Sequence, residues 1–304
     1  MQYLEEFVSA SDGHEIPIRV WRPHSVDKII VIAHGMAEYC ERYAPLAEWL
    51  TQFNIAVVAL NHRGHGMDCL DEDLGFFADH FGWQLVIEDL HKTIAFAREE
   101  MPNVPITLFG HSMGSFIAQS YFEKFNDIDQ LILCSTNRID RPKLSVSLLM
   151  LAFIKFFKGK RGTSAFVDFL SFGIFNNKFK PTRTESDWIS RDTEHVDAYV
   201  ADPYCGYSCT LLLWQDFISG MLSISPKKWN DKIPIHFISG TQDPVGEFGK
   251  GIQKLVSHAK ALGKNVCSFK LYPGARHELV NETNAEEVWT DIRDIVVNGS
   301  LINQ

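Results

Sequence analysis

Hydrophobic and polar positions in the first 136 residues follow two different periods. Continuous apolar runs are typical of strands buried on both faces of a sheet, and four occur, at 28–35, 55–66, 105–110 and 130–135. The second run continues into a glycine-rich loop. Between the runs, apolar residues three and four positions apart predict amphipathic helices at 42–53, 82–101 and 113–125. This alternation is typical of an α/β protein with a mostly parallel sheet and helices on both sides.

The pattern also predicts how the chain is divided. A β-hairpin opens it, because two strand-like segments at 5–10 and 16–22 flank the turn signal SDGHE. From about 137 to 231 the chain is rich in Phe, Leu and Ser and has no clear strand pattern. Strand and helix signals then return at 233–240, 250–262, 267–273 and 285–298. We therefore expect a core in two parts, 1–136 and 232–304, with residues 137–231 inserted as a helical cap.

A possible nucleophile lies at the centre of the first part. Gly110-His111-Ser112-Met113-Gly114 is a G-x-S-x-G pentapeptide that directly follows the strand pattern ITLF and opens a helix. This is the context of a nucleophile elbow, a turn so tight that side chains at the flanking positions would collide with backbone. The helix N-terminus behind Ser112 would favour a developing negative charge. The alternative is an ordinary glycine-containing turn with an incidental serine.

A serine hydroxyl needs a base, and in this kind of fold the acid and then the histidine follow the serine in the chain. Asp243 comes after the strand pattern IHFIS, and His277 lies in a loop after the last predicted strand. Asp140 is the rival acid, and Asp243 before a proline is also a common turn residue. The rival histidines are His236, within a strand, and His258, on a helix. The sequence favours Ser112, Asp243 and His277 as the catalytic residues.

Two backbone N–H groups are needed to hold an oxyanion. One is expected from Met113, which follows the nucleophile. The other is expected from the loop after the strand pattern IIVIA, where Met36 follows His34 and Gly35. A plain turn at the end of a strand is the alternative for His34 and Gly35.

Five motifs in this order support a family resemblance over nearly the whole chain except the cap. They are HGMAEYCERY at 34–43, NHRGHGMD at 61–68, GHSMGS at 110–115, GTQDPV at 240–245 and YPGARHEL at 272–279. The chain resembles the monoacylglycerol lipase and lysophospholipase branch of the α/β-hydrolases, which is close to the serine aminopeptidases. The resemblance implies the α/β-hydrolase fold and ester hydrolysis through an acyl-enzyme, with no metal or organic cofactor.

The resemblance also implies roles for residues around the site. Glu38 and Arg42 match the family's paired charged residues near the oxyanion loop, with a structural role. The loop 62–66 matches one that supports the site without reacting. One position departs from the family, which often has Asp where this chain has Asn61.

Composition and charge limit the classes of partner. The net charge of −9 disfavours nucleic acid as a partner. A small ester is the partner that the resemblance implies. Six scattered cysteines without a C-x-x-C pair favour a reducing compartment over a disulfide framework or a zinc site. The sequence shows no secretory signal and no apolar run of about 20 residues. We therefore expect a soluble, cytoplasmic protein.

The cap carries a segregated charge. The segment from Arg141 to Arg161 contains six basic residues and no acidic one. Since the whole chain has a net charge of −9, the rest of the chain carries −15. The basic residues are Arg141, Lys143, Lys155, Lys158, Lys160 and Arg161. Together with the apolar stretch 144–157, they are consistent with a lid that touches membrane surfaces transiently and admits acyl chains. The alternative is a helix packed on its own domain, and the aromatic residues of 166–175 fit either an acyl tunnel or cap core.

Three functions therefore stay open. The first is hydrolysis of monoacylglycerol, lysophospholipid or a similar ester, and acyl transfer to another alcohol would use the same intermediate. The second is a peptidase or amidase, which needs an acid to hold a substrate amine. Candidates for that acid in the cap are Asp168, Glu185, Asp187, Asp192 and Glu194. The third is a ligand-binding protein without activity, against which the complete set of catalytic residues argues.

Overall fold

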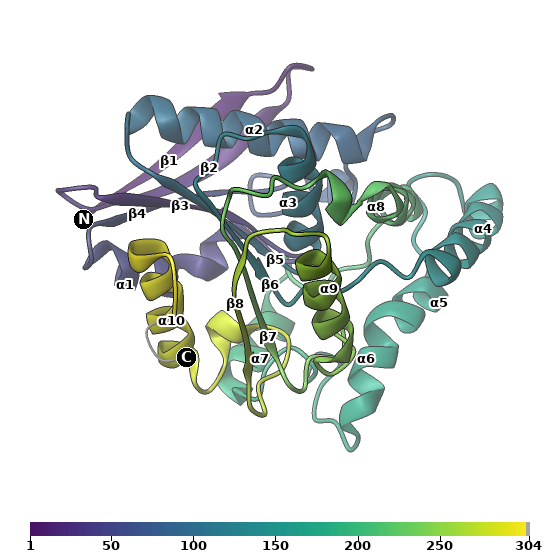
Figure 1. Ribbon diagram of the computed structural model, residues 1–304. Helices are drawn as coiled ribbons and strands as arrows, with labels where there is room; N and C mark the ends of the chain where they lie inside the picture. The colour runs from purple at the N-terminus through teal and green to yellow at the C-terminus, as the bar shows by residue number, and fades with distance from the viewer. Residues whose placement is uncertain (302–304) are drawn as a thin grey trace.

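The computed structural model describes residues 1–301, which form one eight-stranded sheet with helices on both of its faces (Figure 1). The strands are β1 (Gln2–Ser9), β2 (Glu15–Arg22), β3 (Lys28–Ala33), β4 (Ile55–Leu60), β5 (Ile106–His111), β6 (Gln130–Cys134), β7 (Ile235–Gly240) and β8 (Val266–Tyr272). Their order across the sheet is β1-β2-β4-β3-β5-β6-β7-β8. The predicted mostly parallel α/β sheet is confirmed.

The first two strands form the predicted antiparallel hairpin, which joins the sheet by antiparallel pairing of β2 with β4. All other neighbouring strands are parallel. Parallel strands with helical crossovers place their carboxyl ends at one edge of the sheet, so the loops after β3, β5, β7 and β8 meet there. These are the loops that carry the predicted site residues.

Five helices cover the sheet: α1 (Ala44–Thr51), α2 (Gly82–Glu100), α3 (Met113–Lys124), α9 (Lys250–Ala261) and α10 (Ala285–Asn298). Buried residues of α2, α3 and α9 pack in the apolar cluster on one face, and those of α1 and α10 in the cluster on the other. Side chains of β3 alternate between the two clusters, Val31 facing one and Ile32 the other, because side chains along a strand point alternately to opposite faces.

One predicted helix is shorter than expected. The pattern at 42–53 predicts a single helix, whereas the structure has the 3₁₀ turn η1 (Cys40–Tyr43) followed by α1. Pro45 lies in the first turn of α1, where its missing N–H leaves no hydrogen bond unmade.

The segment between β6 and β7, predicted as the cap, contains five helices: α4 (Arg141–Lys158), α5 (Ala165–Asp168), α6 (Ile174–Asn176), α7 (Thr193–Ala201) and α8 (Leu211–Ser223). A π-helical turn, η3 (Phe169–Gly173), joins α5 to α6. α8 packs on α2 and α3 of the core, and α4 packs on α8 at the outer side (Figure 1). The name cap is kept below for residues 137–231.

No helix within residues 1–301 is both long enough and apolar enough to cross a membrane.

Candidate active site

Ser112 occupies the sharp turn between β5 and α3. β5 ends at His111 and α3 begins at Met113, which leaves Ser112 between them with φ 50° and ψ −119°. A positive φ is unfavourable for a residue with a Cβ, so neighbouring groups must hold it. The Ser112 N–H donates to Cys134 O at 3.1 Å, and the Ser112 carbonyl accepts from the N–H and hydroxyl of Ser115 at 2.9 and 2.6 Å. The strained turn is thus fixed from both sides.

The two glycines of the pentapeptide are required by close backbone approaches. A Cβ on Gly110 would lie 2.6 Å from Gly114 O, and a Cβ on Gly114 would lie 2.0 Å from Ala33 O. Both distances are too short for any side chain. The absence of side chains here lets α3 pack directly against the ends of β5 and β3.

The structure brings Ser112, His277 and Asp243 into one hydrogen-bonded chain. His277 Nε2 lies 2.9 Å from Ser112 Oγ, and His277 Nδ1 lies 2.9 Å from Asp243 Oδ1. Asp243 is fully buried, and its carboxylate also accepts from Ser239 Oγ at 3.1 Å and from the Val245 N–H at 2.9 Å. Since an ionised carboxylate accepts hydrogen bonds only, these contacts favour a carboxylate that accepts a proton-bearing Nδ1. Nε2 is then free to accept the Ser112 proton.

Within the described residues, the rival residues make no hydrogen bond with Ser112, His277 or Asp243. Asp140 caps α4, where its Oδ1 accepts from the Lys143 N–H at 3.3 Å. His236 is buried within β7 and pairs with Ser268 Oγ at 2.8 Å, and His258 is exposed on α9. Neither histidine has a partner among the three residues described above.

His277 is enclosed by two aromatic rings. The rings of His111 and Trp188 each lie with their centroid 4.8 Å from that of His277. Burial lowers the pKa of His277, but the Asp243 carboxylate and its hydrogen bond outweigh burial and raise the pKa above its usual value. The pKa of His111 is held well below its usual value by burial and by the nearby His277. Trp188 comes from the cap and is part of no motif, so no pattern in the sequence pointed to it.

The loop after β3 reaches Ser112. A Cβ on Gly35 would lie 3.3 Å from Ser112 Cβ, and Met36 and Met113 both line the same cavity as Ser112. His34 accepts from the His62 N–H through Nε2 at 3.0 Å, and its Nδ1 lies 2.7 Å from Gly35 O. Because burial holds the pKa of His34 well below its usual value, the ring is neutral, and Nδ1 must carry the proton that binds Gly35 O. In a trans peptide the N–H points opposite to the carbonyl, so His34 sets the direction of the Met36 N–H.

Glu38 and Arg42 belong to a larger buried cluster. Glu38 accepts from the Gly35 N–H at 2.5 Å and from Arg42 Nη1 at 2.9 Å. Arg42 also holds Glu278, the residue after His277, through two hydrogen bonds of 2.9 and 2.6 Å. Glu278 in turn lies 2.8 Å from Nε2 of His195 on cap helix α7. The pair inferred from the resemblance therefore connects the oxyanion loop, the His277 loop and the cap.

Burial and neighbouring charges shift the pKa values of the two carboxyl groups of this cluster in opposite directions. Burial raises the pKa of Glu38 to about 7, against the lowering effect of Arg42. Burial also raises the pKa of Glu278, but Arg42 and the hydrogen bond with His195 outweigh it and bring the pKa well below its usual value. Glu278 follows His277 directly in the sequence and could have been suspected. His195 had no such signal.

The cap also holds the oxyanion loop by its backbone. Ala37 O accepts from the hydroxyl of Tyr199 at 3.1 Å and from the N–H of Gly206 at 2.9 Å. Ala37 has a φ of 53°, so two cap groups help to fix an unfavourable backbone conformation one residue after Met36.

Ser112 opens into a cavity of about 250 Å³ between the core and the cap. Its walls are mostly apolar and aromatic side chains, which include Leu144, Phe172, Phe175, Trp214, Phe217, Ile218 and Met221. One side is polar, with Asn137, Arg138, Asp140, Lys143 and Glu247. A substrate with an apolar arm and a polar end fits this lining.

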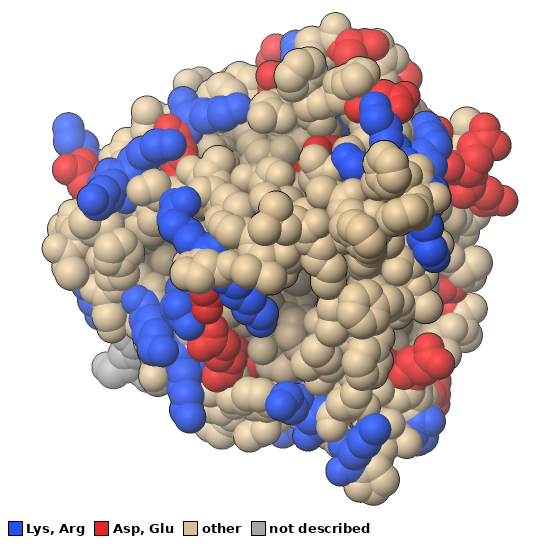
Figure 2. All heavy atoms as spheres, turned by 90° about the vertical axis from the view of Figure 1, so that its right-hand side faces the viewer, with Lys and Arg blue, Asp and Glu red and all other residues tan. Residues whose placement is uncertain are grey.

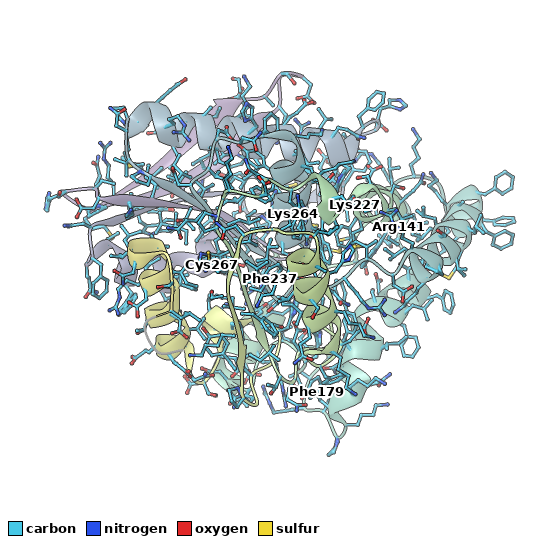
Figure 3. The ribbon with its side chains drawn as sticks, viewed as in Figure 1. Arg141, Phe179, Lys227, Phe237, Lys264 and Cys267 are labelled. Carbon is cyan, nitrogen blue, oxygen red and sulfur yellow. The ribbon has the colours of Figure 1, made fainter. Side chains whose placement is uncertain are left out.

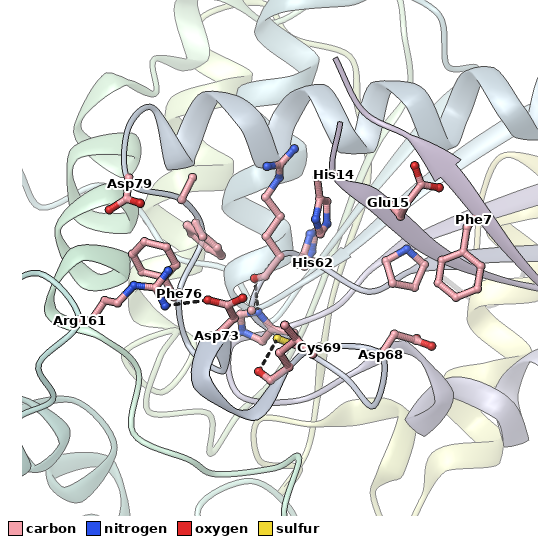
Figure 4. A pocket seen from close by; sticks show the side chains of 17 residues that line it. Phe7, His14, Glu15, His62, Asp68, Cys69, Asp73, Phe76, Asp79 and Arg161 are labelled. Carbon is pink, nitrogen blue, oxygen red and sulfur yellow. Dashed lines mark hydrogen bonds and ion pairs between the residues drawn. The ribbon is translucent and has the colours of Figure 1, made fainter. Parts of the chain in front are cut away.

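A second cavity, of about 450 Å³, lies beside the loop 62–66 (Figure 4), and Ser112 does not line it. Arg63 of that loop makes two hydrogen bonds with Asp89, at 2.6 and 2.9 Å, and two with Asp12, at 2.6 and 2.8 Å. A Cβ on Gly64 would lie 2.4 Å from Phe76 O. The loop is thus tightly held and supports His34 from behind, as the resemblance implies.

Asn61 suits its surroundings better than Asp would. Its Oδ1 accepts from the Cys40 N–H at 2.8 Å, and its Nδ2 donates to Glu41 at 3.3 Å and to Asp68 at 3.5 Å. Arg19 lies between the same two carboxylates, at 2.8 and 2.6 Å. An amide supplies the donor that two neighbouring carboxylates need, which accounts for the departure from the family.

The acids proposed to hold a substrate amine do not line the Ser112 cavity within the described part of the chain. Asp192 caps α7 by accepting from the N–H groups of Glu194 and His195. Asp187 accepts from Thr184, and Asp168 accepts from Ser208. The acids that line the cavity are Asp140 and Glu247, both beside Arg138.

Comparisons with known proteins agree with this geometry. The family model described as serine aminopeptidase, S33, matches residues 24–284. The chain is 27% identical to a monoglyceride lipase of Rattus norvegicus over 284 residues, which cover 92% of this chain and 85% of that protein. It is 26% identical to a monoacylglycerol lipase of Mycolicibacterium smegmatis over 295 residues, 94% of either protein.

Solved structures show the same fold. A thermostable carboxyl esterase from Bacillus coagulans, in complex with glycerol, is 28% identical and superimposes with a TM-score of 0.89, covering 98% of this chain and 99% of that one. A soluble variant of the monoglyceride lipase of Saccharomyces cerevisiae has a TM-score of 0.76 at 17% identity, covering 100% of this chain and 97% of that one. Because the family model spans most of the chain, this protein belongs to the serine aminopeptidase S33 family and is an α/β-hydrolase related to monoglyceride lipases and esterases.

Proposed function

We propose that this protein is a serine carboxylic ester hydrolase that acts through an acyl-Ser112 intermediate on monoacylglycerol, lysophospholipid or a similar lipid-like ester. The observation that carries the proposal is the hydrogen-bonded chain from Ser112 Oγ through His277 to Asp243, at the base of a cavity with apolar walls. The kinship with monoglyceride lipases and a carboxyl esterase supports the same reaction class.

The geometry supports the following first half-reaction. His277 Nε2 accepts the Ser112 proton as Oγ attacks the ester carbonyl carbon, and Asp243 stabilises the resulting imidazolium. The N–H groups of Met36 and Met113 hold the oxyanion. His277 then gives its proton to the leaving alcohol, and the acyl group stays on Ser112.

The second half-reaction uses the same groups. A water replaces the alcohol, His277 takes its proton, and the attack releases the carboxylic acid and restores Ser112. The apolar wall of the cavity favours an acyl chain, and its polar side favours the alcohol part of the ester.

The cap supplies the second part of the proposed function, transient contact with a lipid surface. Apolar side chains on one side of α4 face outward: Val146, Leu149, Phe153, Phe156 and Phe157 are 67 to 83% exposed. They recur three and four residues apart and so form one stripe, opposite the buried Leu151. Figure 2 shows this side of the molecule as a broad surface with few charged side chains at its centre and with Lys and Arg around it. A patch of this kind marks an interaction site.

Most of the basic residues of this segment have protein partners. Arg141 donates to Leu222 O and Ile224 O, and Arg161 pairs with Asp73 at 2.7 Å. Lys155 donates to Gln215. These contacts fix α4 to the rest of the protein, as the packed-helix alternative expects. The proposed surface contact therefore rests on the apolar stripe more than on the charge.

A chain-length series of p-nitrophenyl esters, measured beside an amino-acid p-nitroanilide, tests the hydrolase. Ester turnover should be highest at medium or long chains and lost in Ser112→Ala. Ser120→Ala, on the same helix and with a buried hydroxyl that has no partner in residues 1–301, is the matched control and should keep its activity. Anilide turnover without ester turnover would favour a peptidase, and no turnover of either would favour a binding protein.

A further inference from the structure

A third cavity, a cleft of about 480 Å³, lies next to the Ser112 cavity and is lined by basic side chains. It is formed by the start of α4, the 3₁₀ turn η5 (Pro226–Lys228) and α9, and Arg141 and Lys227 are labelled there in Figure 3. Its basic residues are Arg138, Arg141, Lys227, Lys254 and His258. Ile224 and Leu255 contribute its apolar floor.

Much of the positive charge of this cleft has no carboxylate partner among the described residues, the exception being Arg138, which lies beside Asp140 and Glu247. No acidic residue lines it within residues 1–301, and Lys227 and Lys254 have no carboxylate within ion-pair distance there. The guanidinium of Arg141 donates to two backbone carbonyl groups, which carry no net charge. Glu123 of α3 pairs with the neighbouring Lys228 of η5, at 3.4 Å, and does not line the cleft.

The protein is acidic overall, with 38 Asp and Glu residues against 29 Lys and Arg, yet the described lining of this cleft has five basic side chains and no acidic one. Several unpaired cations that face one cleft create a local positive potential that attracts anions. The repulsion among them is relieved when an anion binds.

Arg138 connects the cleft with the substrate cavity, because it lines both. One end of its guanidinium lies 3.4 Å from Asp140 and 3.3 Å from Glu247. These two carboxylates offset part of the Arg138 charge, so the charge available to a ligand comes mainly from Arg141, Lys227 and Lys254.

We propose that this cleft is a binding site for a phosphomonoester group. Such a group carries a charge of about −1.5 to −2 near neutral pH and has three strong acceptor oxygens, which match two arginines and two lysines. A singly charged carboxylate would leave more of the positive charge unpaired. The cleft is larger than a phosphate alone and has an apolar floor, so it also holds the small organic group attached to the phosphate.

The same chemistry is offered by the headgroup of an anionic lipid and by a free phosphorylated metabolite. The proposal is independent of the reaction at Ser112. Binding is therefore measured directly, and ester hydrolysis serves only to show that each variant is folded.

Calorimetric titration of the full chain with glycerol 3-phosphate, in buffer free of phosphate and sulfate, tests whether the cleft binds a free phosphorylated metabolite. Co-sedimentation with phosphatidylcholine vesicles, with and without phosphatidate, tests the lipid form. The variant is Lys227→Gln with Lys254→Gln. Its matched control is Lys232→Gln with Lys260→Gln, which changes the net charge equally at two exposed lysines outside the cleft.

We expect at least one probe to bind, and the Lys227/Lys254 variant to bind it at least tenfold more weakly while the Lys232/Lys260 variant is unchanged. Binding of glycerol 3-phosphate identifies a free ligand, and binding only of phosphatidate vesicles identifies a lipid. The proposal is overturned if neither probe binds, or if both variants bind as the wild type does. Vesicle binding that does not depend on phosphatidate belongs to the apolar stripe of α4, so only the binding that phosphatidate adds, and its loss in the Lys227/Lys254 variant, tests the cleft.

Discussion

Arg42 and Glu278 form a buried ion pair with two hydrogen bonds, of 2.9 and 2.6 Å, between residues that are 236 positions apart in the chain. Arg42 lies in η1, just after the oxyanion loop, and Glu278 follows His277. The pair therefore ties together the loops that carry Met36 and His277, two of the residues to which the proposed function assigns roles. Its side chains are 8% and 5% exposed, so little water can replace either partner.

Arg42→Ala should lower the free energy of unfolding by about 3–5 kcal/mol, because it leaves Glu278 as an uncompensated buried charge beside Glu38. Urea denaturation followed by circular dichroism measures the effect. Arg183→Ala is the matched control, since the Arg183–Asp197 pair is exposed and should cost less than about 1 kcal/mol. Equal losses in both variants would contradict the importance of the buried pair.

Asp243→Asn should lower kcat about 10⁴-fold and move the acid limb of the pH profile to lower pH. His277 must be neutral to act as a base, so kcat/KM of the wild type falls as the pH drops through the raised pKa of His277. Removing the Asp243 charge removes the largest cause that raises this pKa. Asp140→Asn, which changes the rival acid, should leave the acid limb of the pH profile at the same pH. A limb that stays fixed in Asp243→Asn would contradict the assignment.

His34→Ala should lower kcat about 10²-fold with little change in KM, because the Gly35–Met36 peptide loses the hydrogen bond that directs the Met36 N–H. Steady-state kinetics on one p-nitrophenyl ester measure both constants. His236→Ala is the control, as His236 is equally buried but contacts Ser268 in the sheet. If His236→Ala lowers kcat as much as His34→Ala does, the loss in His34→Ala comes from general destabilisation and not from the direction of the Met36 N–H.

Asn61→Asp should lower the free energy of unfolding by about 1–3 kcal/mol at neutral pH, since it places a third carboxylate beside Glu41 and Asp68. The new carboxyl has a raised pKa in the folded state, so the folded state binds its proton more tightly. The loss is therefore present above that pKa and disappears as the pH falls through it. Urea denaturation at pH 7.5 and at pH 4.5 measures the difference, and an equal loss at both values would contradict this explanation.

Phe153→Ser with Phe156→Ser should weaken binding to phosphatidylcholine vesicles at least tenfold, because burying one such side chain contributes about 1.5–3 kcal/mol. Turnover of a short, water-soluble ester should not change, as neither residue lines the Ser112 cavity. Phe7→Ser is the matched control. Phe7 is 53% exposed on β1, which belongs to the hairpin at the edge of the sheet and not to the cap (Figure 1). Unchanged vesicle binding in the double variant would remove the apolar stripe from the proposed function.

The sequence predicts the sheet and its helices well, because buried parallel strands such as 28–33 leave an unmistakable apolar run. It also predicts Ser112, Asp243 and His277, since each follows a strand and the parallel order brings strand ends together. Trp188 and His195 could not be predicted. Both come from the cap, whose short helices leave no sequence pattern that predicts how they pack on the core. Both act through contacts with residues more than 80 positions away.

The hydrogen bonds from Tyr199 and Gly206 to Ala37 have a consequence for how this protein can change over evolution. An insertion between two strands could be exchanged freely if it served only to select substrates. Here the inserted segment also holds the backbone next to Met36. A chimera that receives the cap of a relative keeps its turnover only if the donated segment presents a hydroxyl and an N–H to the same carbonyl. Substrate range and catalytic rate are therefore inherited together.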